Sequence, residues 1–442
     1  MFSKSSGSFR ASQIMSTFTR SLPSLIRATA VVLPVTLSAG TAPPVSPPLL
    51  PAASPWTYAI GMTVKEGYDD NLYLQSQGDQ AGLESWLTTV VPALAATYQP
   101  GPAFKAAFSY APEITYYASE PAEDNVVHRG ALNLGGSSGD TVWEQLNAIT
   151  QITGNDLGPT FTGGSVFPAL GGIALRERRD AVVYRNSFKL TQTLGKAFVR
   201  PLLSSYVHDF QTQQHAPTGG TACYENFIGR SDLSAGLDCG YQVAAKTWLV
   251  LGYRFGHQEQ GELLGAASRY SNNYQRLLVG IEGAPASWLK FSLLAGPDVR
   301  DFTDAPPASF DADETLLFID ATLSLMPTAQ DTLTAAVRYY EQPAYTSQSI
   351  YQDSLYEFTY RHKFSTRFSA GAGFKIGGAD WQPPVVRDDW VYTPSATLVY
   401  THDQHLSAEL AYSYDWADSE IPNTNAREYT RNLVSLGLKY SF

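Results

Sequence analysis

Long apolar runs are missing from this sequence beyond its N-terminal region. After residue 45, no stretch approaches the ~18 consecutive apolar residues that a membrane-spanning helix requires. Mean hydropathy is -0.17, a value typical of a soluble protein. These absences exclude a bundle of spanning helices. They do not exclude a membrane barrel, because only alternate residues of a barrel strand face lipid and average hydropathy therefore stays low.

Cysteine is also scarce, with only Cys223 and Cys239 in the chain. A small secreted fold stabilised by several disulfides is therefore excluded. Cys239 falls on a predicted strand and Cys223 falls in the loop before it. Extended residues advance roughly 3.3 Å each, so the two Cα atoms lie farther apart than the ~7 Å limit for a bridge. We expect two free thiols.

Basic residues are fewer than acidic ones, 30 against 41. Four of the basic residues precede residue 28, before an apolar run at 28–37 and small residues at 38–42. This order predicts a signal peptide at 1–42 for export through the Sec route, with Met1 or Met15 as the start and cleavage near Gly40 or Ala42. Its removal changes the formal net charge from -11 to -15, which excludes nucleic acid as a partner. The prolines of 43–55 predict a stiff periplasmic spacer.

From Trp56 to the C-terminus, segments that alternate apolar and polar residues recur along the chain. Alternation with period two is the pattern of a half-buried strand. The pattern predicts an all-β fold, a transmembrane antiparallel barrel of about 18 strands over 56–442. Mixed faces at 141–152 and 198–210 leave 16 strands as the alternative. The predicted strands are 56–66, 83–98, 104–117, 126–136, 141–152, 179–192, 198–210, 226–242, 247–258, 271–282, 288–300, 314–326, 332–342, 350–364, 367–377, 390–400, 406–416 and 429–442.

Short and long connections alternate along these predicted strands. The short ones contain turn-forming residues, whereas the long ones are loops. A barrel with both termini in the periplasm has short turns at that end and long loops outside the cell. A soluble sandwich has no reason to keep this alternation. The short connections are 99–103, 137–140, 193–197, 283–287, 327–331 and 401–405, and the long ones include 153–178, 211–225, 257–270, 301–313, 378–389 and 417–428.

The last strand has one apolar face, formed by Val434, Leu436, Leu438, Tyr440 and Phe442. Small and polar residues occupy the other face. This strand is similar to the C-terminal strand of bacterial outer-membrane barrels. The similarity implies that Tyr440 and Phe442 form the signal by which the barrel-assembly machinery recognises the chain.

Residues 66–74, with the sequence EGYDDNLYL, and residues 85–92, SWLTTVVP, resemble the start of the putative beta-barrel porin 2 family. Those proteins are exported barrels of Gram-negative bacteria. The resemblance implies residence in the outer membrane, contact with its lipid, and association with surface or exopolysaccharide systems. It identifies Asp69, Asp70 and Asn71 as the turn motif that follows the first strand. These oxygens suit a hard cation, but no bidentate Glu follows at ligand spacing, which favours a hydrogen-bonded turn and no metal or cofactor.

Basic residues dominate the polar face of the predicted strands. Rings of Arg and Lys in a pore favour anions. The alternative is a wall of cross-strand ion pairs, for example Arg338 between Asp320 and Glu357. The inward basic residues are Arg185, Lys189, Arg230, Arg254, Arg276, Lys290, Arg338, Arg361, Lys363, Arg367 and Lys375, and the inward acids are Asp232, Asp238, Asp320, Glu357 and Glu409.

No group of residues indicates an enzyme, because the histidines are scattered over turns and loops without ligand or triad spacing. The sequence predicts a porin-like channel for passage or export of polar or anionic solutes or glycans, as a monomer or trimer. The alternative is a structural or surface-interaction barrel with an occluded lumen, whose extracellular loops bind a partner. Conductance of the purified protein distinguishes the two.

Overall fold

The computed structural model describes residues 54–79, 81–101, 103–153, 180–214, 226–345, 347–419 and 428–442. The predicted signal peptide, nearly all of the Pro-rich spacer and Cys223 lie outside these residues. Strands make up most of the described chain, together with one short 3-10 helix, Pro121–Glu123. The strands are β1 Trp56–Asp69, β2 Ser85–Gly101, β3 Phe104–Tyr110, β4 Glu113–Tyr117, β5 Asn125–Ser138, β6 Thr141–Thr153, β7 Ala181–Leu194, β8 Ala197–Phe210, β9 Arg230–Ala244, β10 Thr247–Gln260, β11 Asn272–Ala286, β12 Leu289–Phe302, β13 Leu316–Leu325, β14 Asp331–Pro343, β15 Ile350–Lys363, β16 Phe368–Trp381, β17 Arg387–Thr401, β18 Leu406–Ser419 and β19 Tyr429–Ser441.

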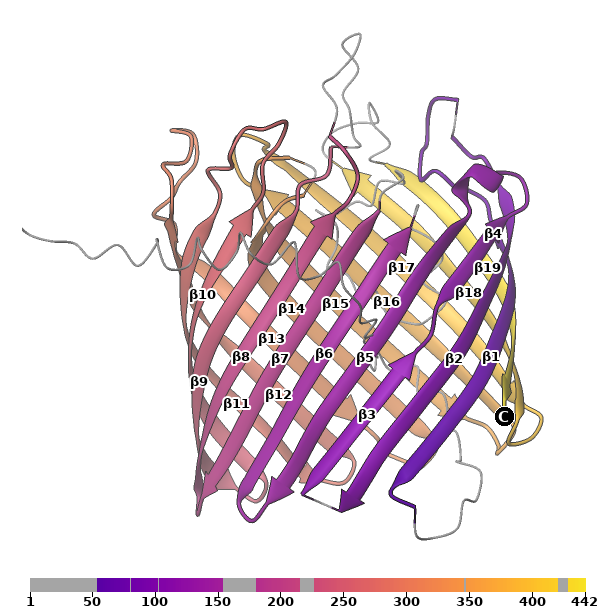
Figure 1. The fold of residues 1–442 in the computed structure, drawn as a ribbon, viewed down its shortest axis with the longest axis horizontal. Helices are drawn as coiled ribbons and strands as arrows, with labels where there is room; N and C mark the ends of the chain where they lie inside the picture. Colours follow the sequence, from indigo (N-terminus) through magenta and orange to yellow (C-terminus); the bar gives the residue numbers. More distant parts are fainter. Residues whose placement is uncertain are drawn as a thin grey trace, which may run out of the picture. The chain divides into compact units, whose positions relative to one another are not determined.

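All the strands form one antiparallel sheet that closes where β1 pairs with β19 (Figure 1). Strands β3 and β4 both lie between β2 and β5, so together they fill one position. Pro112 stands at the break between them and has no N–H to donate to the ladder. The nineteen strands therefore make a closed wall of eighteen positions. The prediction of 18 strands is confirmed, including the two segments with mixed faces.

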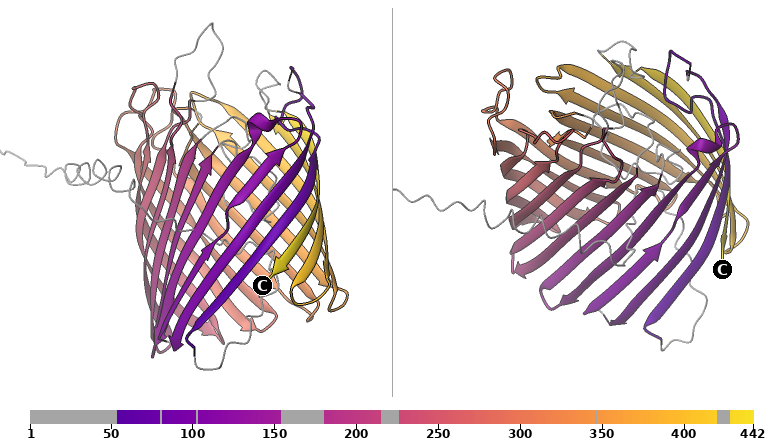
Figure 2. Two further views of the ribbon diagram at one scale, coloured as in Figure 1. Left: turned by 45° about the vertical axis from the view of Figure 1, so that its right-hand side comes forward. Right: turned by 45° about the horizontal axis from the view of Figure 1, so that its top comes forward.

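The connections sort to the two ends of the barrel as predicted. Eight short turns lie at one end, which is also where β1 begins and β19 ends. Nine connections lie at the other end, drawn at the top of Figure 1 and turned toward the viewer in Figure 2, right, and most of them are longer. The predicted long loop 378–389 is an exception, because β16 and β17 extend into it and leave only residues 382–386 between them. The longest of the nine, between β6 and β7, falls mostly outside the described residues.

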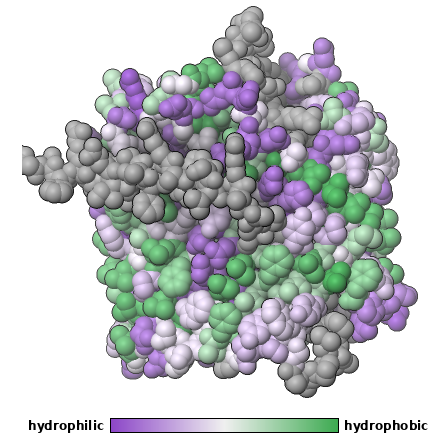
Figure 3. All heavy atoms as spheres, viewed as in Figure 1, coloured by the Kyte–Doolittle hydropathy of each residue, from purple (hydrophilic) through white to green (hydrophobic). Residues whose placement is uncertain are grey.

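The outer face of the wall is apolar. On β10, Leu249, Leu251 and Phe255 are exposed, while Val250 on the opposite face is buried. Figure 3 shows apolar residues over the wall and hydrophilic residues gathered at the long-loop end. Such a band is what lipid requires of a barrel. Among the described residues, no helix has the length and apolar character needed to cross a membrane.

Aromatic side chains pack across neighbouring strands of this wall near both ends. The ring centroids of Trp56 and Tyr98 are 4.7 Å apart, and those of Tyr392 and Trp416 are 5.1 Å apart. Rings at these depths fit the girdles at the two interfaces of a membrane barrel. Cys239 is a free, exposed thiol on β9.

The closing strand β19 alternates as the sequence predicts. Val434, Leu436 and Phe442 are exposed, whereas Ser435 and Ser441 on the other face are buried. The backbone N–H of Phe442 donates to the carbonyl of Ile60 at 2.9 Å, so the terminal residue is still tied to β1.

Candidate functional site inside the barrel

Strand β14 leaves the wall before it ends. Its ladder with β13 stops at the pair Ile319 and Tyr339, whereas its ladder with β15 continues to the pair Pro343 and Ile350. The ends of β14 and β15 therefore turn away from β13 as a unit. We name residues 340–345 and 347–352 the inturned hairpin. All described residues from Ile350 to Leu355 are buried on both faces of β15.

The inturned hairpin docks on strands that are not its neighbours in the sheet. Arg230 on β9 donates from Nη1 to the carbonyl of Pro343 at 2.6 Å. Four strand positions, β10 to β13, separate β9 from β14 in the sheet order. The contact can therefore form only across the interior of the barrel. The hairpin occupies part of the lumen near the long-loop end.

Side chains replace the backbone partners that the free edge of β14 has lost. Arg300 donates from Nη2 to the carbonyl of Glu341 at 2.7 Å. Gln260 donates from Nε2 to the carbonyls of Ala344, Ser347 and Ser349. Proline suits this edge because it has no N–H to leave unpaired. These side-chain donors thus satisfy backbone carbonyl groups that would otherwise be buried without a hydrogen bond.

An aromatic cluster holds the tip of the hairpin. The Tyr345 ring lies 5.5 Å from Phe210 and 6.0 Å from Phe227, measured between centroids. Its carbonyl accepts the N–H of Ile228 at 2.7 Å. These contacts fix the tip against β8 and the residues that precede β9.

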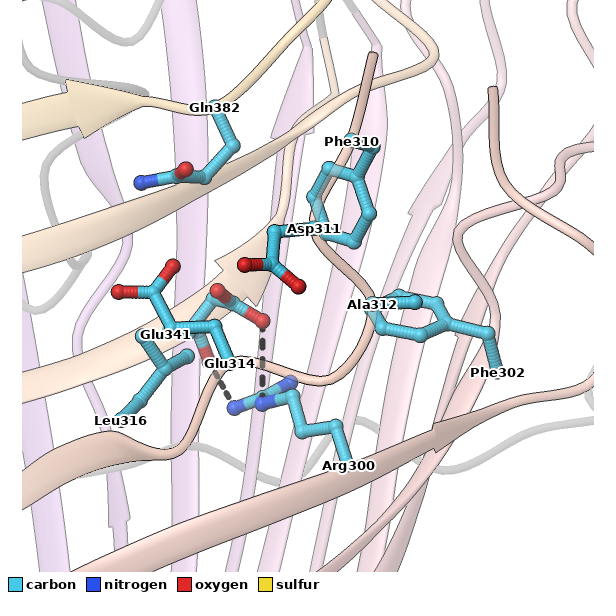
Figure 4. A pocket seen from close by; sticks show the side chains of 9 residues that line it. All are labelled: Arg300, Phe302, Phe310, Asp311, Ala312, Glu314, Leu316, Glu341 and Gln382. Carbon is cyan, nitrogen blue, oxygen red and sulfur yellow. Dashed lines mark hydrogen bonds and ion pairs between the residues drawn. The ribbon is translucent and has the colours of Figure 1, made fainter. Parts of the chain in front are cut away.

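Arg300 is the most heavily bonded cation at this site. Its Nη2 lies 2.9 Å from Asp298 and its Nε lies 3.1 Å from the Glu341 carboxylate. Figure 4 shows Arg300 joined to Glu341 at the base of a pocket that Phe302 and Phe310 also line. Within the described ranges, no group of His, Cys, Asp and Glu side chains is arranged to hold a metal ion.

The side-chain contacts of Arg230 contrast with those of Arg300. Its side chain is only 5% exposed, yet it makes no ion pair with a described residue. Its Nε and Nη2 atoms are buried without a hydrogen-bond acceptor. The guanidinium lies 5.7 Å from the Tyr206 ring and 5.4 Å from the Tyr345 ring. A buried cation held by aromatic rings, one carbonyl and the Tyr351 phenol, without a paired carboxylate, is an unusual arrangement.

Further cations surround the hairpin. Arg185 on β7 interacts electrostatically with Tyr340 and with Arg338 on β14. Asp353 is the carboxylate that interacts with Arg230, Lys375 and Arg338, and it accepts a hydrogen bond from Gln342 at 2.6 Å. Arg185, Arg230 and Arg338 therefore lie around Tyr340 together with the Asp353 carboxylate. The hairpin's own carboxylate, Glu341, pairs with Arg300.

Elsewhere the inner wall is an ion-pair network. Asp238 pairs with Arg200 at 3.0 Å and with Arg254 at 2.6 Å. Arg276 pairs with Asp298 at 3.0 Å. The two interpretations of the basic inner wall, an anion-favouring pore and a wall of ion pairs, thus apply to different regions. Arg254 and Arg276 are in ion pairs, whereas Arg230 is not.

The other basic residues named in the sequence analysis vary in placement. Arg338 and Lys290 are exposed and make no ion pair with any residue of the described ranges. Asp320 stands opposite Arg338 in the register, but the ion pair that the alternative interpretation places between them is not formed. Arg361 lies on β15, and Arg367 lies in the exposed turn before β16.

The motif of Asp69, Asp70 and Asn71 closes the barrel. Asp69 accepts from Nε and Nη2 of Arg431 at 2.9 and 2.7 Å, and Asp70 accepts from the N–H of Asn432 at 2.6 Å. Asn71 donates from its amide nitrogen to the carbonyl of Thr430 at 2.8 Å. The oxygens of Asp69 and Asp70 are thus engaged by β19, and Oδ1 of Asn71 accepts the N–H of Gln75 at 3.0 Å. The motif is a hydrogen-bonded turn that joins the first and last strands.

Several residues of the site were missed by sequence reasoning. Arg200 lies on a strand whose faces look mixed, and Arg387 lies in a segment expected to be loop. Glu341 lies at a position of β14 that the period-two pattern assigns to the outer face, so the sequence did not identify it as an inward residue. Pro343 is the one signal in the sequence, since a proline favours an edge position.

The closed antiparallel wall, its apolar outer band and its polar interior are those of a transmembrane β-barrel. The family model of putative beta-barrel porin 2 matches residues 288–442. This is the family that residues 66–92 resemble, although the matching part lies at the other end of the chain. No curated protein matches the sequence.

Solved structures provide a further comparison. A BenF-like porin from Pseudomonas fluorescens Pf-5 has 8% identity and a TM-score of 0.44, with 87% of this chain and 99% of that chain covered. OccK2 (OpdF) of Pseudomonas aeruginosa, solved in complex with glucuronate, has 10% identity and a TM-score of 0.42, with 87% and 98% covered. The outer membrane protein opdK of Pseudomonas aeruginosa has 10% identity and a TM-score of 0.41, with 88% and 99% covered.

Proposed function

We propose that this protein is a porin-like channel of the outer membrane that passes polar solutes and prefers anions. The observation that carries the proposal is the inturned hairpin, which narrows the lumen where Arg185, Arg230 and Arg338 lie around Tyr340. Fixed positive charge at a constriction lowers the barrier for anions and raises it for cations. Fold and family point to a channel rather than to an enzyme.

In this proposal the short turns face the periplasm and the long loops face outside, after export through the Sec route. The C-terminal Tyr440 and Phe442 present the insertion signal to the assembly machinery. Both side chains are exposed at the short-turn end of β19, where such a signal is accessible. A link to exopolysaccharide stays an expectation from the family resemblance.

The test is a planar lipid bilayer that contains the purified protein, with a KCl gradient across it. We expect discrete conductance steps and a reversal potential displaced toward the chloride equilibrium value. Displacement toward the potassium value contradicts anion preference. A folded protein that gives no steps supports the alternative, a barrel with an occluded lumen whose loops bind a partner.

A further inference from the structure

Arg230 differs from the other buried arginines of the inner wall. Arg300, Arg387 and Arg431 each pair with a carboxylate. Arg230 has the Pro343 carbonyl on Nη1, two aromatic rings beside it and a hydrogen-bonding interaction with the Tyr351 phenol, but it pairs with no carboxylate of the described residues. Asp353 acts on Arg230 electrostatically but forms no ion pair with it.

Two side-chain nitrogens of Arg230 lack an acceptor. The corresponding nitrogens of another arginine in this protein bind a carboxylate. Arg431 uses Nε and Nη2 to hold both oxygens of Asp69, at 2.9 and 2.7 Å. On Arg230 the same two atoms are buried without an acceptor. This edge of a guanidinium matches the geometry of a planar carboxylate in a bidentate pair.

We propose that Arg230 is a binding site for the carboxylate of a solute in the lumen, and that the inturned hairpin competes with the solute for this site. The inference rests on the proposed channel function and names the solute class. In the structure, the hairpin covers the site with Tyr345 and places a neutral carbonyl on Nη1. A carboxylate satisfies Arg230 better, because it supplies charge and two acceptors.

A second carboxylate on the same solute would have other cations nearby. Tyr340 is an electrostatic neighbour of Arg230 and Arg338, and also of Arg185. These cations come from β7, β9 and β14, so they surround the hairpin from two sides of the lumen. A small dicarboxylate therefore fits the site better than a monocarboxylate.

The experiment measures binding of succinate to the purified, detergent-solubilised barrel by isothermal titration calorimetry. Succinamide, the uncharged diamide of the same shape, is the ligand control. Arg230→Lys keeps the charge but loses the bidentate edge, and we expect it to weaken succinate binding by about tenfold or more. Lys290→Gln removes one exposed lumen charge away from the hairpin and should change the affinity less than twofold.

Competition by the hairpin is tested with Gln260→Ala. This change removes the donor to three hairpin carbonyls. It should raise the population of undocked hairpin and therefore tighten the apparent affinity for succinate. An unchanged or weaker affinity overturns the competition. Equal binding of succinate and succinamide, or full affinity in Arg230→Lys, overturns the carboxylate site.

Folding and channel function are monitored separately. Heat-modifiable migration on gels shows whether each variant forms a closed barrel. Arg230→Lys keeps a cation at this position, so it can be tested even if larger changes prevent folding. The reversal potential in KCl tests the channel without succinate. Anion preference without Arg230-dependent succinate binding overturns this inference alone, whereas cation preference overturns the proposed function.

Discussion

Arg431 and Asp69 join the last strand of the barrel to the first. The guanidinium holds both carboxylate oxygens, and the Asp69 side chain is fully buried. A closed barrel has one seam at which its two chain ends must meet in register. The pair places a specific, charge-assisted contact at that seam, one residue from the Asp70 and Asn432 contacts.

Breaking this pair should destabilise the barrel strongly. Arg431→Met leaves the Asp69 carboxylate buried without its cation, which costs about 3–5 kcal/mol. The double variant Asp69→Leu with Arg431→Met should be closer to wild type, because both charges are gone. Urea titration of the barrel, followed by heat-modifiable migration, measures both. A double variant as unstable as the single one contradicts the reasoning.

The strands and their connections could be predicted from sequence because alternation is a local property. A strand that faces lipid on one side and water on the other shows period two, whatever its neighbours are. The inturned hairpin could not be predicted in this way. Whether residues 340–343 stay in the wall or turn inward depends on hydrogen-bond donors far away in sequence, such as Arg230 and Gln260.

The candidate site shows the same limit. Arg230 could be assigned to the inner face from its place in the alternation, but its contact with the Pro343 carbonyl depends on where β14 leaves β13. The alternative interpretation, with Arg338 paired to Asp320, had the register right, but register partners need not form an ion pair. Whether Arg338 and Lys290 line a conducting pore stays a prediction.

Gly252 leaves room for the ion pair of Asp238 with Arg254. A Cβ at position 252 would lie 2.7 Å from Oδ1 of Asp238, the atom that binds Arg254. Gly252→Val should displace this pair and destabilise the barrel by about 1–3 kcal/mol. Gly101→Val is the control, because a Cβ there meets no atom within 4 Å. Equal loss of stability in the two variants, measured by urea titration, contradicts this role.

Asp403, in the turn between β17 and β18, should titrate below an ordinary aspartate. Its carboxylate accepts the N–H groups of His405 and Leu406 at 2.7 and 2.8 Å, which lower its pKa. A folded pKa below the unfolded one stabilises the turn above the unfolded pKa, and this contribution disappears as pH falls through the folded pKa.

NMR titration of the Asp403 carboxyl carbon measures the midpoint, with Asp403→Asn to assign the resonance. A midpoint at or above that of an unfolded peptide shows that the two backbone donors do not hold the carboxylate.

Removal of the hairpin tip should widen the channel. Pro343 and Ile350 are register partners, so an Asn-Gly turn can replace residues 344–349 without a change of register. The tip then no longer reaches Gln260 or the aromatic cluster, and single-channel conductance should rise several-fold. Deletion of residues 304–309 from the loop between β12 and β13 is the control and should leave conductance unchanged. If the tip deletion conducts no better than wild type, the hairpin is not the constriction.

Charge reversal at Arg338 should change ion selectivity. The side chain is exposed on the inner face, without an ion partner in the described parts of the chain, and it interacts with Arg185 across the lumen. Arg338→Glu places a carboxylate in the constriction, so the ratio of chloride to potassium permeability should fall several-fold or invert. Arg269→Glu makes the same change of charge on an exposed loop residue and should leave the ratio near that of wild type. Reversal potentials measured under a KCl gradient give both ratios. Equal shifts in the two variants would mean that overall charge, rather than the position of Arg338 at the hairpin, sets the selectivity.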